Sequence, residues 1–219
     1  YEFTRRVSHT RGLRVLRARA DLLSAGSPFL LARQLLRRAI GCRDGDAIAV
    51  QLDALRAHAV ELHIADATIL EFLGELIGLR KHVDPSPELR AARNDPQIMN
   101  LRLRRAFSAW LAALSAAGPL LLVLEDSHWG DAITLSYLAD ALRELAGCPV
   151  LLLALARPDA TVVLPELLRL PARQHIELGG LTPRASAALA RELHGLELSA
   201  SVPASIVERA HASPTWALE

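Results

Sequence analysis

PLLLVLEDSHWGD, residues 119–131, is the stretch that decides the fold. Five apolar residues, Leu120 to Leu124, run directly into two adjacent acids, Glu125 and Asp126. A short apolar run bounded by proline and by polar turn residues predicts a buried strand. In an open parallel sheet, ligands bind in the crevice beyond the C-terminal ends of the strands. The stretch therefore predicts a buried strand that carries two carboxylates to a ligand site.

The residues after the acids predict a crossover to a second strand. Asp131 can cap a helix whose apolar residues recur at steps of three and four as far as Leu145. Pro149 then opens a second apolar run, Val150 to Ala156. Two such runs joined by a helix form a βαβ unit, which places the two strands side by side and parallel. Runs this short are also compatible with buried helix, but the prolines that bound them favour strands.

Periodicity and chain breakers divide the remaining sequence. Ser27 can cap a helix and Pro28 can occupy its first position. The further elements that we expect are a helix end over Tyr1–Thr10, a strand over Arg14–Ala20, a helix over Pro28–Ala39, irregular helices over Asp44–Leu79, a long helix over Leu101–Ala116, a strand over His175–Leu178, and helices from Thr182 to His194 and from Val202 to Ala212.

Composition is typical of a globular protein with an aliphatic core. The 219 residues are 51% hydrophobic and only 4% aromatic. Lys and Arg number 25 against 24 Asp and Glu, and a net charge of +1 gives no strong attraction to nucleic acid or acidic lipid. The cysteines, Cys42 and Cys148, have no metal-like spacing and are expected to be free thiols in a cytoplasmic protein. No apolar run reaches the roughly 18 residues that a membrane span needs.

The paired acids are the strongest candidates for chemistry. Two carboxylates at a strand end could hold a hydrated Mg²⁺ and activate a water for attack on a γ-phosphate. Neighbouring strand residues point to opposite sides, so we assign Glu125 to the metal, and Asp126 to the attacking water or to orienting Glu125. Arg157 follows the second apolar run, where its guanidinium could reach a γ-phosphate. The alternatives are a solvated acidic turn and an arginine in a surface turn. His58 and His63 lack the i, i+4 spacing of a zinc helix and are expected to be surface or hydrogen-bonded histidines.

These residues resemble a known class of ATPase domain. LLLVLEDSHWGDAITLSYLADAL resembles the Walker B region of STAND-class AAA-like ATPase domains, of the type fused to bacterial serine/threonine protein kinases and LuxR-type regulators, with Ser127 in place of an apolar residue. VLLLALARPD resembles the sensor 1 strand, with Arg157 at the sensor position. IELGGLTPRASAALARELHG resembles the next strand and the first lid helix. HASPTWALE resembles the lid motif, which implies that Pro214 lies against the adenine, although Ala212 and Ser213 replace the usual Gly and Asn.

The resemblance covers essentially the whole chain and implies an α/β fold. It implies a P-loop NTPase-like parallel sheet flanked by helices in three αβα layers, with an ATPase core over residues 1–179 and the start of a helical lid over residues 180–219. The chain contains no GxxxxGK[ST] loop, so we expect the core to lack its Walker A strand and loop, with Tyr1 just after them. The strand ending near Arg157 and the strand at His175–Leu178 would then each lack a neighbour.

The implied function is a signalling switch in a larger regulatory protein that binds ATP and Mg²⁺ and hydrolyses ATP slowly. The parent polypeptide would be an ATPase, which could also be a serine/threonine protein kinase, and this chain is expected to be weak or inactive alone. Its expected partners are ATP and other domains of the same polypeptide, and it could form a homo-oligomer. Neither nucleic acid nor a membrane is expected to contact this segment. The alternative is a degenerate ATPase-like scaffold that binds other proteins.

Overall fold

A computed structural model of the chain describes residues 2–7, 9–43, 45–79, 84–157, 165–180, 182 and 184–185. The chain separates into two compact units, Tyr1–Arg173 and Gln174–Glu219. In the second unit, the Ala185 amide donates a hydrogen bond to the Thr182 hydroxyl at 3.3 Å, as a helix cap at Thr182 would require. The rest of that helix, the helix expected at Val202–Ala212 and the site residue Pro214 lie outside the described residues.

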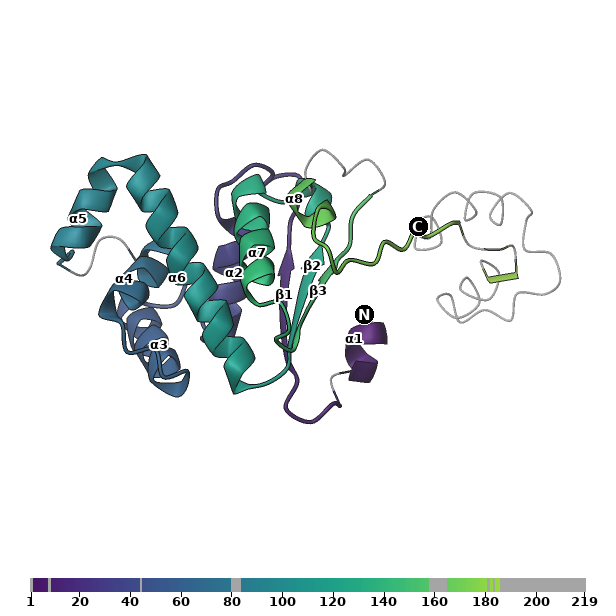
Figure 1. The fold of residues 1–219 in the computed structure, drawn as a ribbon, viewed down its shortest axis with the longest axis horizontal. Helices are drawn as coiled ribbons and strands as arrows, with labels where there is room; N and C mark the ends of the chain where they lie inside the picture. Colours follow the sequence, from purple (N-terminus) through teal and green to yellow (C-terminus); the bar gives the residue numbers. More distant parts are fainter. Residues whose placement is uncertain are drawn as a thin grey trace. The chain divides into compact units, whose positions relative to one another are not determined.

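The first unit is built on three parallel strands, β1 (Arg14–Arg19), β2 (Leu120–Glu125) and β3 (Val150–Ala154). Their order is β1-β2-β3, so the strand predicted from residues 119–131 lies at the centre (Figure 1). The apolar residues of β2 are buried on both faces of the sheet, which explains their unbroken run. The predictions of an α/β fold, of a parallel sheet flanked by helices and of the βαβ unit are confirmed.

Helices surround the sheet and extend beyond one side of it (Figure 1). The described helices are α1 (Glu2–Val7), α2 (Leu30–Ala39), α3 (Ile48–Glu61), α4 (Ala67–Leu76), α5 (Pro87–Asn94), α6 (Pro96–Ala117), α7 (Ala132–Glu144) and α8 (Pro165–Leu168), with a 3₁₀ turn η1 at Ser127–Trp129. Side-chain caps followed by proline start two of them: Ser86 caps α5 and Asp95 caps α6. The long helix therefore begins five residues earlier than its apolar stripe indicated.

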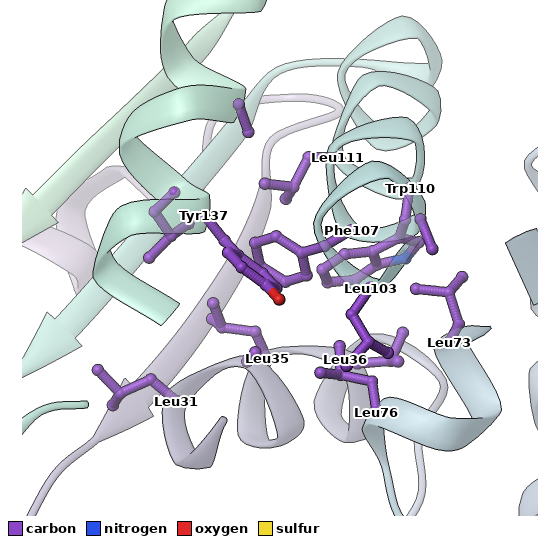
Figure 2. Close-up of a cluster of buried hydrophobic side chains, with 14 of the residues drawn as sticks. Leu31, Leu35, Leu36, Leu73, Leu76, Leu103, Phe107, Trp110, Leu111 and Tyr137 are labelled. Carbon is purple, nitrogen blue, oxygen red and sulfur yellow. The ribbon is translucent and has the colours of Figure 1, made fainter. Parts of the chain in front are cut away.

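The core lies on the sheet face covered by α2, α6 and α7 (Figure 2). Phe107 and Trp110 of α6 pack with ring centroids 5.5 Å apart, and Phe107 lies 6.2 Å from the ring of Tyr137 on α7. Leu73 and Leu76 of α4 join the same cluster, which ties the helices beyond the sheet to it. Large aromatic side chains that touch several helices contribute strongly to such a core.

The opposite face of the sheet is less fully covered. The guanidinium of Arg17 on β1 donates a hydrogen bond to the hydroxyl of Thr4, which attaches α1 to this face. Leu151 on β3 remains 56% exposed, and β3 forms one edge of the described sheet. The side of β3 away from β2 therefore presents backbone groups that no described strand pairs.

Three further sequence predictions differ from the structure. Helix α2 begins at Leu30 rather than Pro28, because Phe29 adopts a left-handed conformation with φ 62°. Strand β3 ends at Ala154, two residues before the expected Ala156. His175–Leu178, which belongs to the second unit, is not a strand in the structure. Without a neighbour for its backbone groups, a short apolar run gains little from an extended conformation.

Neither cysteine forms a disulfide: Cys42 is buried and free, and Cys148 is exposed and free. Among the described residues, no helix is long and apolar enough to cross a membrane.

A buried histidine joins the helical region to the core. His58 on α3 is 5% exposed, and its Nε2 accepts a hydrogen bond from Trp110 Nε1 at 3.1 Å. Its Nδ1 lies 3.6 Å from Oε2 of Glu61, and the other carboxylate oxygen, Oε1, accepts a 2.7 Å bond from Arg14. An imidazole that accepts from an indole N–H must be neutral at that nitrogen. The prediction of a hydrogen-bonded histidine is confirmed for His58.

Burial lowers the pKa of His58, although the nearby Glu61 acts in the opposite direction. The unfolded chain then binds a proton more readily than the folded chain, so folding stability is full above the unfolded pKa of about 6.5 and falls as pH drops below it. Between about pH 7.5 and 5.5, this single group can remove at most about 1.4 kcal/mol. Urea unfolding at both pH values should show this loss in the wild type and a smaller one in His58→Gln. Equal losses in both proteins would contradict the assignment.

Candidate functional site

The site is built at the C-terminal end of β2, where the strand passes into η1. Leu120, Leu122 and Leu124 belong to the core cluster, so alternation along the strand places Glu125 on the other face of the sheet. Arg19, the last residue of β1, is the register partner of Glu125. The parallel pairing of β1 with β2 therefore brings a basic residue beside the first of the two predicted acids.

The second acid leaves the strand in an unusual conformation. Asp126 has φ 52°, in the left-handed region that few residues other than glycine adopt. Its carboxylate accepts a 2.8 Å charge-assisted bond from Arg19 Nε. The side chains of this ion pair are 68% exposed for Arg19 and 41% exposed for Asp126. A surface pair of this kind contributes only about 0–1 kcal/mol, so Asp126 can exchange this partner for another at little cost.

Arg19 is itself held by a helix side chain. Its amide donates to Gln34 Oε1 at 2.8 Å, and Gln34 Nε2 donates to its carbonyl oxygen at 2.8 Å. The carboxamide thus bonds to the backbone of β1 at its free edge, as a neighbouring strand would. This pair of hydrogen bonds from α2 fixes the end of β1 and so positions the Arg19 guanidinium.

Ser127 ties the end of β3 to the end of β2. It is fully buried, and both its amide, at 2.9 Å, and its hydroxyl, at 2.8 Å, donate to the carbonyl oxygen of Leu155. The Leu155 amide in turn donates to the Leu124 carbonyl at 2.8 Å, extending the pairing past the end of β3. A buried hydroxyl needs such a partner. The serine that departs from the resembled pattern therefore makes a specific bond between the two strand ends.

The turn after η1 is locked against α2. A Cβ on Gly130 would lie 2.9 Å from the Ser127 carbonyl oxygen and 2.9 Å from Leu31 Cδ1, so only glycine fits. The next residue, Asp131, is 3% exposed, and its carboxylate accepts hydrogen bonds from the amides of Phe29 at 3.0 Å, Leu31 at 3.2 Å and Thr134 at 2.8 Å. The predicted cap of α7 is confirmed, and the same carboxylate also holds the start of α2.

The remaining residues of the motif face one another. The ring centroids of His128 and Trp129 are 5.0 Å apart, and the Arg157 guanidinium lies 5.9 Å from the centroid of Trp129. Both ring nitrogens of His128 are buried and have no hydrogen-bond partner in the part of the chain that the structure describes. Arg157 is exposed and, within the same described ranges, forms no ion pair with Glu125 or Asp126. The structure thus places Arg157 against the turn that follows the acids.

The two carboxylates at this strand end suit a hard cation that takes its remaining ligands from water or from a bound molecule. Carboxylate oxygens are the ligands that Mg²⁺ uses in proteins, and Mg²⁺ commonly takes one or two carboxylates together with water and phosphate oxygens. Glu125 and Asp126 supply two such groups at one strand end. Within the described residues, no cluster of three or more His, Cys, Asp or Glu side chains is arranged to hold a metal by protein ligands alone. The residues fit a magnesium ion only as part of a shared site.

No pattern in the sequence indicates a functional role for Arg19 or Gln34. The alternation in Arg14–Ala20 predicts a strand, but an arginine at a strand end is not informative until the strand order is known. The pairing of β1 with β2, and the contact of α2 with the edge of β1, both join residues far apart in the chain.

Comparison with known proteins gives one distant match. No family model matches the chain, and no solved structure matches it. An uncharacterized protein of Rhizobium meliloti (strain 1021) is 30% identical over 96 residues. The match covers 44% of this chain and 9% of that protein, so the similarity is to a short segment of a much longer polypeptide. These comparisons assign the chain to no family.

Replacing Asp131 with alanine should destabilise the fold more than removal of an ordinary cap. The change removes the cap of α7 and leaves the Phe29 and Leu31 amides without their acceptor, which together should cost about 3 kcal/mol. The matched control is Asp66→Ala, because exposed Asp66 caps only α4, through the Thr68 amide, and its loss should cost clearly less than the loss of Asp131. Urea unfolding measures both, and equal costs would contradict the double role of Asp131.

Proposed function

We propose that the chain is part of an ATP-Mg-binding switch domain in a larger regulatory protein. The observation that carries the proposal is the pair of adjacent carboxylates, Glu125 and Asp126, at the C-terminal end of the central strand of a parallel sheet. That end of an open α/β sheet is where such folds bind ligands. The resemblance to STAND-class AAA-like ATPase domains supports the nucleotide as the ligand.

In this proposal each residue at the strand end has a role. Glu125 would hold Mg²⁺, and Asp126, once free of Arg19, would share the metal or orient the attacking water. The bound ion would supply charge neutralisation on the β- and γ-phosphates. Arg157 would respond to the γ-phosphate from the end of β3, and Pro214 would lie against the adenine. The loop that binds the phosphates would come from another part of the polypeptide.

One observation favours the alternative of a degenerate scaffold that binds other proteins. The carboxylate of Asp126 is already paired with Arg19 at 2.8 Å, which is the arrangement expected of an acid retained for structure. The two candidates differ in whether the polypeptide binds and hydrolyses ATP.

Measurements on the full-length protein distinguish them. ATP hydrolysis is expected in the wild type, and Glu125→Gln or Asp126→Asn should lower kcat by about 100-fold or more, because each removes a charge that the transition state needs. The control is Glu144→Gln, a neutralisation on the exposed end of α7 that should leave kcat unchanged. ATP hydrolysis that is unaffected by both site variants would refute the assigned roles. A wild type that neither binds nor hydrolyses ATP would support the scaffold.

The 219-residue chain by itself should bind ATP-Mg more weakly than about 1 mM, the upper end of ordinary substrate affinities. It contains no GxxxxGK[ST] loop, so it lacks the backbone cradle and the lysine that supply most of the phosphate contacts. Isothermal titration calorimetry with ATP and MgCl₂ measures the affinity. Micromolar binding would show that the phosphates are held by other residues of this chain.

A further inference from the structure

A cavity of about 380 Å³ lies among α3, α4 and α5, in the helical region whose role the sequence did not indicate. Its volume is within the range of small-molecule sites. Leu55 from α3, Leu70 and Gly74 from α4, and Leu89 from α5 form apolar parts of its wall. The residues that line it do not include any of the site at the end of β2, so it is a separate feature of the molecule.

Gly74 keeps this cavity open. It lies inside α4 and is buried, and glycine weakens a helix interior relative to alanine. The packing does not require glycine there, because a Cβ would meet only Leu55 Cδ2, at an ordinary contact distance of 3.7 Å. Its backbone is also helical, without the positive φ that would favour glycine. The effect of the missing side chain is therefore to leave space in the wall.

One wall of the cavity presents acceptors. Glu71 and Glu75 are one turn apart on α4 and both line the cavity. The carboxylate of Glu75, with a side chain 4% exposed, is bound by Arg93 through Nε at 3.3 Å and Nη2 at 3.0 Å. Glu71 accepts from the amide of Ser86 at 2.8 Å and from its hydroxyl at 2.5 Å. A carboxylate has about four lone-pair sites, so Glu71 can accept further hydrogen bonds at the cavity wall.

We propose that this cavity binds a small apolar molecule that carries a primary amine. The amine would donate to the carboxylate of Glu71, which among the described residues forms no ion pair, and the apolar body would lie against Leu55, Leu70 and Leu89. A charge-assisted bond to a carboxylate is stronger than a neutral one, so an amine should be preferred over an alcohol of the same shape. Arg56 and Arg93 also line the cavity, but they are paired with Asp53 and Glu75, so they do not offset the repulsion between Glu71 and a carboxylate of that shape. This site is independent of the proposed nucleotide function.

The test uses three probes of nearly equal shape: 2-phenylethylamine, 2-phenylethanol and phenylacetate. Binding to the 219-residue chain is followed by chemical-shift changes in its NMR spectrum, with the Gly74 amide as the reporter. The amine should bind saturably and about tenfold more tightly than the alcohol, and phenylacetate should not bind. Equal binding of all three probes, or no saturable shift at Gly74 with the amine, would overturn the proposal.

Variants distinguish binding in this cavity from nonspecific binding elsewhere on the protein. Gly74→Leu should fill the cavity and abolish binding of the amine, and Glu71→Gln should reduce the affinity for the amine to that for the alcohol. The matched control is Glu88→Gln, an exposed neutralisation on α5 outside the cavity, which should change neither affinity. If Gly74→Leu does not fold, Gly74→Ala provides the same test, because it should raise the melting temperature of the protein and lower its affinity for the amine. Undiminished amine binding in Gly74→Ala and Glu71→Gln would refute the site.

Discussion

The carboxylate of Asp131 connects the parts of the structure that meet beyond the central strand. It is 3% exposed and accepts hydrogen bonds from the amides of Phe29 and Leu31 at the start of α2 and of Thr134 in α7. Burying a charged group is costly unless it is fully hydrogen-bonded, and here three N–H donors converge on it. Both helices cover the core face of the sheet, so their starting points fix how they pack. The turn at Gly130, which excludes any side chain, brings the carboxylate to this position.

The same arrangement determines what the strand end can offer to a ligand. Asp131 anchors helix α2, which carries Gln34. The carboxamide of Gln34 binds both the backbone N–H and the backbone carbonyl of Arg19. Arg19 then reaches Asp126, while Ser127 binds the carbonyl of Leu155 beyond β3. The hydrogen bonds of Asp131, Gln34 and Ser127 therefore hold the frame, and the exposed ion pair is the part that can change partner at little cost.

The helical region has a different organisation. Its contacts with the sheet run through the aromatic cluster of α6 and the bond from Trp110 to His58, while its own cavity opens among α3, α4 and α5. The buried carboxylate of Glu75 is paired with Arg93 within this region. The two candidate sites of the described chain thus lie on separate elements and depend on separate side chains.

The sequence by itself determined the local features: the buried central strand, the βαβ unit, the cap at Asp131 and the presence of two acids at a strand end. These follow from periodicity, breakers and caps, which act over a few residues. Tertiary structure alone decided that β1 lies beside β2, that Arg19 binds Asp126, that Asp131 also holds α2 and that His175–Leu178 is not a strand. Each of these depends on contacts between residues distant in the chain. A strand or an ion pair exists only when its partner is present, and no local pattern specifies that partner.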